Sequence, residues 1–183
     1  MRLTVFKLAL TLLLVVMART AAAQARPSCG VDRWPVKVWA DKQASLVDTV
    51  PVAATVQTLA SLPVPELVYP ENGRMRPHEF RTYRVRAVVE RITVEDDGDW
   101  HLVLSAPGTP GLKLIAELPS PECATSVALA NRFRAARDSL RRVPRRGVVD
   151  IAGIGFWDYI HNQRNGARNG FELHPVTLIV PIR

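Results

Sequence analysis

A single stretch of helical periodicity, placed between two groups of alternating segments, is the feature of this 183-residue sequence that most constrains its fold. The apolar positions of this stretch, at intervals of four, three, four and three residues, are Leu129, Phe133, Ala136, Leu140 and Val143. This spacing places them on one face of an amphipathic helix. Thr125 or Ser126 is expected to cap the start of the helix, and Pro144 to stop it. One helix within otherwise alternating sequence predicts a mainly β fold.

Three strands are predicted before this helix, over residues 82–94, 100–105 and 112–119. The apolar positions of the first strand change parity near Val88 and Val89, which indicates a bulge in one long, bent strand. Asp97 and Gly98 are a favoured pair for a two-residue hairpin turn between the first and second strands. The three strands therefore form an antiparallel meander.

Two more strands are predicted after the helix, over residues 147–157 and 171–182. Three strands, a helix and two strands, with a bent first strand, is the order of the OB-fold, a five-stranded Greek-key barrel. The bulge agrees with this fold, because a strand shared by both halves of a closed barrel must curl sharply. An SH3-like barrel and a β-sandwich are the alternatives, although neither requires a helix at that place. The prediction is an OB-like barrel domain over residues 78–183.

The segment that precedes the barrel, residues 26–77, is predicted to be an irregular arm packed on it, because proline interrupts the segment repeatedly. Within the arm, RWPVKVWAD (residues 33–41) is expected as an edge strand. TVQTLASL (residues 55–62) is expected as a short helix capped by Thr55.

Residues 1–25 have the pattern of a secretory signal peptide, with Arg2 and Lys7 before an apolar run and small residues after it. The run is about ten residues long, short of the roughly 20 that cross a bilayer, and no later segment is apolar enough to do so. Cleavage is expected after Ala25, with Ala23 as the alternative. Removal of the peptide would lower the formal net charge from +7 to about +4, which weakens any general argument for a polyanionic partner. The predicted destination is the periplasm or the medium.

The two cysteines, Cys29 and Cys123, are predicted to form one disulfide bond, as is usual for an exported protein with an even number of cysteines. The alternative is a thiolate pair with a metal or redox role. The sequence has no Cys-x-x-Cys motif and no histidine near either cysteine to support that role. The bond would attach the arm to the barrel.

Five blocks of the sequence resemble those of an uncharacterised family of exported bacterial proteins with an OB-fold-like barrel. These blocks are CGVDRWPVK, EDDGDWHLVL, IAELPSPEC, GIGFWDYIHNQ and NGFELHPV. The resemblance covers most of residues 29–176 and implies an intact exported domain. It implies no established activity and assigns no catalytic residue. Both cysteines lie inside the blocks, which agrees with the disulfide bond.

The segment VEDDGDWHLVL, residues 94–104, concentrates acids and a histidine around the first hairpin. Asp99 and His101 share one face of the second strand, and a symmetric turn around Gly108 would place Asp99 opposite Glu117 on the third. Two opposed carboxylates need a metal ion, an arginine or water between them, unless the register is shifted by two. A divalent cation could here be bound by Asp97, Asp99, His101 and Glu117. The alternative is ordinary turn chemistry, which Asp and Gly favour.

The long polar loop before the last strand is the second candidate site, because long loops in compact domains are often functional. His161 lies in this loop, and Glu172 and His174 share a face of the strand that follows. Two histidines with a carboxylate could bind zinc or act as general acid and base. No hydrolase motif accompanies them, and the alternative is a structural His174 beside a flexible turn.

Arginines that lie largely off the apolar face of the predicted helix are the third candidate site. Their guanidinium groups suit phosphate, sulfate or uronate groups. The residues expected to bind an anionic ligand are Arg134, Arg137, Arg141 and Arg145, together with Arg164 and Arg168 of the long loop. A solvated helix face is the alternative. Tyr83 and Trp100 suit the core better than a base-stacking surface, which weakens the case for single-stranded nucleic acid.

These features favour an exported, non-catalytic OB-like binding module. The sequence does not identify its ligand, for which an anionic polysaccharide or nucleic acid is one candidate. A metal-dependent hydrolase, such as a phosphodiesterase or nuclease that uses the acidic hairpin or the histidine loop, is the alternative. A structural component of the envelope is the third. No cofactor is predicted apart from the divalent metal of the alternative.

Overall fold

The computed structural model describes residues 29–66, 69–160 and 167–182 of the protein. The predicted signal peptide, with His161 and Arg164 of the predicted sites, lies outside the described residues. No helix among the described residues is long and apolar enough to cross a membrane.

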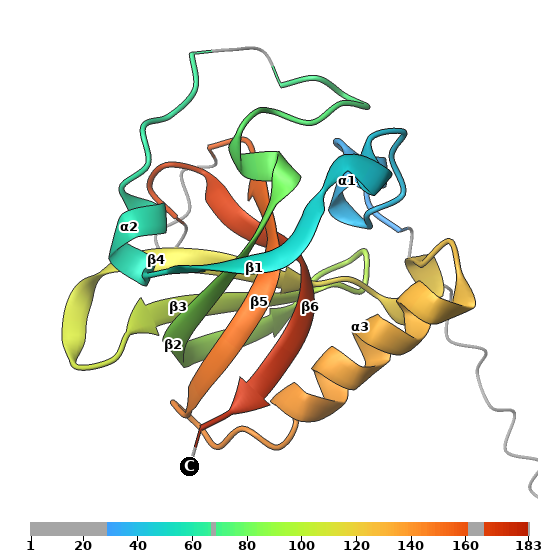
Figure 1. The fold of residues 1–183 in the computed structure, drawn as a ribbon. Coiled ribbons are helices and arrows are strands. Elements are labelled where there is room, and N and C mark those ends of the chain that lie inside the picture. The colour runs from blue at the N-terminus through green and yellow to red at the C-terminus, as the bar shows by residue number, and fades with distance from the viewer. Residues whose placement is uncertain (1–28, 67–68, 161–166, 183) are drawn as a thin grey trace, which may run out of the picture.

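Five strands form a closed barrel, which confirms the predicted mainly β, OB-like fold (Figure 1). They are β2 (Arg81–Val94), β3 (Trp100–Ala106), β4 (Thr109–Leu118), β5 (Val148–Trp157) and β6 (Phe171–Pro181). The strands pair in the order β2-β3-β4-β6-β5, and β5 returns to pair with β2. The β4–β6 pair is parallel, and the other four pairs of the barrel are antiparallel.

Strand β2 belongs to both halves of the barrel. Residues 82–88 pair with β5, and residues 88–94 pair with β3. The register with β3 shifts between Val89 and Arg91, beside the position predicted from the change of parity. The bulge lets one strand turn from one partner to the other, because an extra residue bends the strand and increases its twist.

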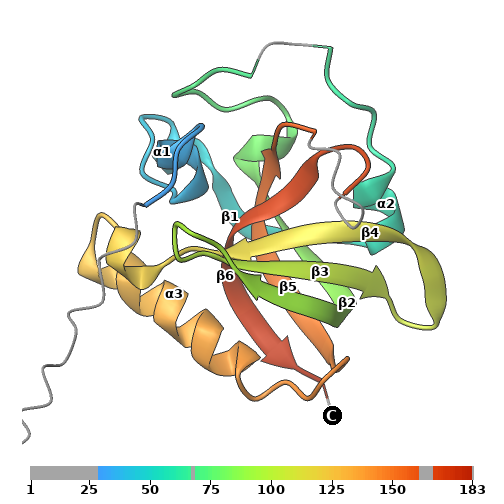
Figure 2. The same cartoon turned by 180° about the vertical axis from the view of Figure 1, so that it is seen from behind.

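Helix α3 (Val127–Leu140) lies between β4 and β5 in the chain and packs against β6, as Figures 1 and 2 both show. The Ser126 hydroxyl accepts a hydrogen bond from the Leu129 N–H and caps the helix. The predicted apolar face supplies the buried side chains Phe133, Ala136 and Leu140. These side chains extend the barrel core, which is filled by alternate residues of the strands, such as Leu102, Leu104 and Leu114.

The arm contains more regular structure than its prolines indicate. It forms helix α1 (Trp34–Lys37), the 3₁₀ helix η1 (Ala44–Leu46), strand β1 (Asp48–Ala54) and helix α2 (Val56–Ala60), which Thr55 caps as predicted. Short 3₁₀ helices, η2 (His78–Phe80) and η3 (Pro121–Cys123), precede β2 and α3. Strand β1 adds to the edge of the sheet, parallel to the first half of β2. The prediction of an edge strand over residues 33–41 is wrong, because this segment forms α1 between left-handed residues at Arg33 and Trp39.

Covalent and ionic contacts attach the arm to the barrel. Cys29 and Cys123 form the predicted disulfide bond. The fully buried guanidinium of Arg33 forms hydrogen bonds with both carboxylate oxygens of Glu79, at 2.8 and 2.6 Å, and with the carbonyl of Trp157. Because a buried charge is costly unless it is paired, these contacts define the position of the arm.

Candidate functional site

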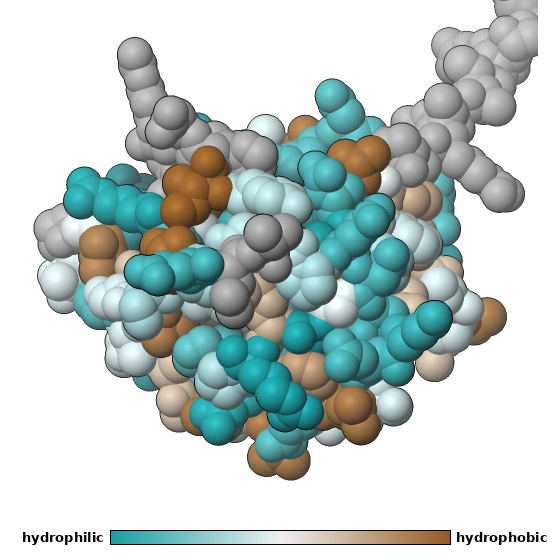
Figure 3. All heavy atoms as spheres, turned by 90° about the horizontal axis from the view of Figure 1, so that it is seen from above, coloured by the Kyte–Doolittle hydropathy of each residue, from teal (hydrophilic) through white to brown (hydrophobic). Residues whose placement is uncertain are grey.

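A cavity of about 540 Å³ lies against the outer face of β3, β4 and β6. The β2–β3 turn, the residues after β5 and the arm surround it. The side chains that matter most for its chemistry are Lys37, Glu95, Asp97, His101, Glu117 and Glu172. Figure 3, which views the molecule from above Figure 1, shows hydrophilic residues over most of the visible surface, with hydrophobic ones in small separate groups. The strands and turns that border the cavity are those at which OB-folds commonly bind ligands.

The β2–β3 turn has three residues, so the prediction of a two-residue Asp97-Gly98 turn is wrong. The N–H of Glu95 donates to the carbonyl of Asp99, and the N–H of Gly98 donates to the carbonyl of Glu95. Gly98 has a φ of 84°, the left-handed conformation that closes a turn of this length. Asp97 accepts a hydrogen bond from the N–H of Asp99 and supports the same turn. This geometry pairs Glu95 with Asp99 across the hairpin.

His101, not Asp99, lies opposite Glu117. The register of β3 with β4 pairs Trp100 with Leu118 and His101 with Glu117, two residues away from the predicted register. The β3–β4 turn is asymmetric, because the register shifts between Ser105 and Ala106. Asp99 lies beyond the last of these pairs, and its carboxylate accepts a hydrogen bond from the N–H of Ser120. The expected opposition of two carboxylates is thereby replaced by an imidazole–carboxylate pair.

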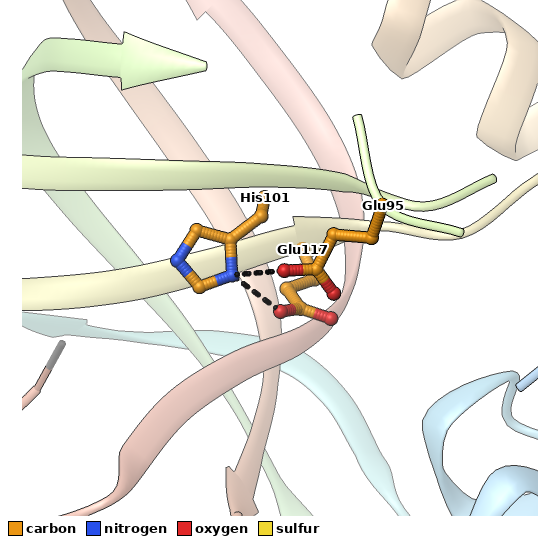
Figure 4. A group of neighbouring side chains, drawn as sticks. All are labelled: Glu95, His101 and Glu117. Atoms are coloured by element: carbon orange, nitrogen blue, oxygen red, sulfur yellow. Dashed lines mark hydrogen bonds and ion pairs between the residues drawn. The ribbon is translucent and has the colours of Figure 1, made fainter. Parts of the chain in front are cut away.

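Two carboxylates converge on one nitrogen of His101, as Figure 4 shows. Nδ1 of His101 lies 2.8 Å from Oε1 of Glu117 and 3.2 Å from Oε1 of Glu95. The side chains of His101 and Glu117 are each 8% exposed, whereas that of Glu95 is 40% exposed. The three side chains therefore form a cluster that is buried on the barrel side and open on the side of the turn.

His174 lies on the other side of Glu117, on β6. Its Nδ1 is 3.1 Å from Oε2 of Glu117, and its Nε2 is 3.4 Å from Oδ2 of Asp99. The imidazole is fully buried, and its edge packs against the ring of Phe156. Both nitrogens lie at ion-pair distance from a carboxylate, but neither has the geometry of a hydrogen bond. A cluster of two imidazoles and three carboxylates thus extends from Glu95 through Glu117 to Asp99.

The charges within this cluster alter the protonation of its members. Burial by itself would lower the pKa of His101, but the carboxylates of Glu117 and Glu95 outweigh it and raise the pKa to about 9. Burial by itself would raise the pKa of Glu117, but His174 and His101 outweigh it and lower the pKa to about 2. His101 is therefore an imidazolium and Glu117 a carboxylate at neutral pH.

Glu172 and Lys37 complete the floor and one wall of the cavity. Burial, followed by the charges of Glu117 and Asp158, raises the pKa of Glu172 well above its ordinary value. Its Oε2 is buried and has no hydrogen-bond partner among the described residues. Nζ of Lys37 lies 3.9 Å from Oδ1 of Asp158 and 5.7 Å from the centre of the Phe156 ring. The arm thus adds a second cationic group, beside the His101 imidazolium, to a cavity lined mainly by acidic side chains.

Most of the residues predicted as metal ligands lie close together in the structure. Asp99, His101, Glu117 and His174 are in one cluster, and Asp97 lines the adjoining cavity. Sequence reasoning missed Glu95 as a site residue, although a three-residue turn ending at Gly98 would have placed it on the face of His101. Lys37 had no such signal, because only the long-range contacts of the arm bring it here.

The predicted arginines that the structure describes, all of the set except Arg164, differ in their surroundings. Arg137 donates from Nη2 to the carbonyls of Gly98 and Leu118, at 2.6 and 2.8 Å, and stacks over Trp100. Arg141 pairs with Asp138 and also lies over Trp100. The exposed members of the set are Arg134, Arg141, Arg145 and Arg168. Arg137 therefore fastens the helix to the hairpin.

Comparisons with known proteins give no family. No protein-family model matches the sequence, and no curated protein matches it. Among solved structures, one similar chain is described as an aspartyl-tRNA synthetase from Leishmania major Friedlin, with 15% identity and a TM-score of 0.45. The match covers 75% of this chain but only 22% of that one. A second is an OBody bound to hen egg-white lysozyme, with 16% identity, a TM-score of 0.40, and coverage of 56% and 82% of the two chains. At these levels of similarity, function must be argued from the site itself.

Proposed function

We propose that this protein is an exported, non-catalytic binding module whose ligand is a small cation held in the cavity beside β3, β4 and β6. The observation that carries this proposal is the composition of the cavity. Among the described residues, six carboxylic acids line it, namely Glu95, Asp96, Asp97, Glu117, Asp158 and Glu172, with Lys37 as the single lysine. Export is supported by the disulfide bond, which persists in oxidising compartments, and by the N-terminal sequence pattern.

The lining of the cavity carries net negative charge, whereas the whole chain has a formal net charge of +7. Even when Glu172 is left out, because burial raises its pKa well above the ordinary value, five carboxylates among the described lining residues face the two cationic groups of Lys37 and His101. A cleft lined by one sign of charge concentrates ligands of the opposite sign, and low-dielectric walls strengthen the effect. The volume of about 540 Å³ falls within the usual range of small-molecule sites.

The same charges disfavour the anionic ligand expected from the sequence. An anion at the cavity would meet the carboxylates of Glu95 and Asp96 at its rim. On the helix, Arg137 has its Nη2 occupied by two backbone carbonyls. The remaining exposed arginines carry charge but line no cavity among those described. We therefore favour a cationic ligand over an anionic polymer.

Calorimetric titration with spermidine, an organic cation, and with heparin, a polyanion, tests this function. We expect spermidine to bind with an affinity that falls as salt rises. The double variant Glu95→Gln, Asp96→Asn should weaken binding about tenfold, because it removes two negative charges from the cavity. Both side chains are exposed at the turn, so the substitutions should leave the fold intact. The matched control, Glu90→Gln with Asp150→Asn, removes the same charge outside the cavity and should have little effect.

Two results would contradict the proposal. One is that heparin binds and spermidine does not, which would restore the anionic ligand. The other is that both double variants weaken spermidine binding equally, which would mean that the net charge of the protein, and not the cavity, attracts the cation.

A further inference from the structure

Three donor atoms from three different segments converge at the inner end of the cavity. Glu95 comes from the β2–β3 turn, His101 from β3 and Glu117 from β4. Oε1 of Glu95, Nδ1 of His101 and Oε1 of Glu117 all lie within 4.8 Å of one another. The segments are held together by strand pairing and by the closed turn, so the arrangement does not depend on flexible side chains meeting by chance.

The hydrogen bonds available within the protein do not satisfy all three of these donor atoms. Nδ1 of His101 can carry only one hydrogen, but two carboxylate oxygens lie 2.8 and 3.2 Å from it. The charge of the imidazolium offsets the repulsion between the two carboxylates, but its one Nδ1 hydrogen can be donated with good geometry to only one of them. A cation among the three atoms would serve both carboxylates at once, whereas one hydrogen cannot.

A second observation, independent of these three residues, also indicates a ligand. The carboxyl group of Glu172 is buried against the same cavity, and its Oε2 has no hydrogen-bond partner among the described residues. An unsatisfied buried oxygen is costly, and native structures commonly explain one by a bound water or ion. Glu172 therefore marks the cavity floor as a place that a polar species occupies.

We propose that Glu95, His101 and Glu117 bind a divalent transition-metal cation of the Zn²⁺ type. This inference rests on the proposed cation-binding function and specifies its ligand. The imidazole nitrogen is a borderline ligand that favours such ions over Ca²⁺ or Mg²⁺, which prefer oxygen ligands alone, and carboxylate oxygens also bind zinc. His174 lies on the far side of Glu117 as a positioning residue, with its Nδ1 3.1 Å from the oxygen of Glu117 that does not face His101. The exposed side of Glu95 leaves room for water as a fourth ligand.

The spacing of the donors fits this kind of ion. Ligands bound to zinc at about 2.0–2.1 Å in tetrahedral geometry lie about 3.3 Å from one another. The two measured separations from Nδ1, 2.8 and 3.2 Å, are close to that value. Small rotations of the two carboxylates, with release of the Nδ1 proton of His101 to solvent and without movement of the strands, would admit the metal.

Equilibrium dialysis of the disulfide-intact protein against Zn²⁺ at pH 7, with bound metal measured by mass spectrometry, tests the proposal. We expect about one Zn²⁺ per chain, and visible absorption bands when Co²⁺ replaces Zn²⁺. His101→Gln should weaken binding about a hundredfold and Glu95→Gln at least tenfold. The matched controls, His78→Gln and Glu90→Gln, lose the same groups elsewhere and should bind like the unaltered protein. His101 is buried, so a loss of binding in His101→Gln can also result from unfolding. Glu95 lies at an exposed turn, and the Zn²⁺ affinity of Glu95→Gln then decides whether the proposal holds.

The outcomes distinguish this inference from the proposed function. If spermidine binds and Zn²⁺ does not, the metal site is wrong and the cation-binding function stands. If neither binds, both are wrong. If Zn²⁺ binds to Glu95→Gln and to His101→Gln as tightly as to the unaltered protein, the metal lies elsewhere and the assignment is overturned. Loss of Zn²⁺ binding in His78→Gln would have the same meaning.

Discussion

His101 and Glu117 make the stability of the metal-free protein depend on pH, and the sign follows from their pKa values. The pKa of His101 is raised from 6.5 to about 9 in the folded protein, so its contribution is fully present below pH 6.5 and is lost as the pH rises through 9. The pKa of Glu117 is lowered from 4.5 to about 2, so its contribution is fully present above pH 4.5 and is lost as the pH falls through 2. Both shifts describe largely one interaction, which is complete between pH 4.5 and 6.5.

Urea denaturation at pH 6.0, 7.5 and 9.0, with a chelator present, measures the alkaline limb of this dependence. We expect the free energy of unfolding to fall by roughly 2 kcal/mol between pH 6 and 9, and to fall much less in His101→Gln. Glu90→Gln should retain the full decrease, because Glu90, with its pKa lowered by the Ser105 hydrogen bond, stays ionised over this range. An unchanged decrease in His101→Gln would show that another group is responsible.

At the same scale, alternation within strands predicted the face of each site residue, but not its partner. His101 on β3, Asp99 just before it, and Glu172 and His174 on β6 alternate with core residues such as Leu102 and Leu173, as a period of two predicts. The partner of a residue on the next strand depends on the geometry of the connecting turn. The three-residue turn at Gly98 and the asymmetric turn after Ser105 both differ from the turns that the sequence predicted. A register error of two residues exchanges Asp99 for His101 opposite Glu117, which changes a repulsive pair into an attractive one.

At the scale of elements, helix α3 is held to the barrel by one arginine as well as by its apolar face. Arg137 donates to two backbone carbonyls, one in the β2–β3 turn and one at the end of β4. Hydrogen bonds from charged groups contribute about 1.5–3 kcal/mol. We expect Arg137→Met to lower the free energy of unfolding by about 2 kcal/mol in chemical denaturation, because the carbonyls lose their donor. Arg134→Met, on the exposed side of the same helix, should change it by less than about 0.5 kcal/mol. Equal effects of the two substitutions would show that Arg137 does not fasten the helix.

The elements that could be predicted are those whose stability comes from their own periodicity. Helix α3 has an apolar face and a Ser126 cap, and both are readable in the sequence. Helix α1 has neither, since its N-cap residue, Arg33, makes no side-chain cap and is held instead by the buried Glu79. Alternating residues around Pro35 looked like a strand, but the long-range ion pair decided the conformation. Local pattern fails where a tertiary contact of this kind dominates.

At the scale of the whole molecule, the arm acts as a clamp: it is bonded to the barrel and also supplies part of the cavity lining. Its disulfide bond joins residues 94 positions apart, and Gly30, Val31 and Lys37 from the arm line the cavity. In the chain-entropy model, a loop of this length stabilises the folded state by ~4 kcal/mol, because it restricts the unfolded chain. The ion pair of Arg33 with Glu79 joins the arm to the barrel, and that of Arg74 with Asp41 lies within the arm. Both form only in the folded protein and do not restrict the unfolded chain in this way.

We therefore expect the double variant Cys29→Ser, Cys123→Ser to remain folded in dilute buffer but to lose ~4 kcal/mol of unfolding free energy. Its urea dependence should also be steeper, because an unfolded chain without the bond exposes more surface. Reduction of the unaltered protein serves as the control and should reproduce both changes. A loss below about 1 kcal/mol, with an unchanged slope, would mean that the unfolded chain is already compact around the arm. In that case the clamp would be maintained by the buried arginine pairs, and the cavity with its Lys37 would persist without the covalent bond.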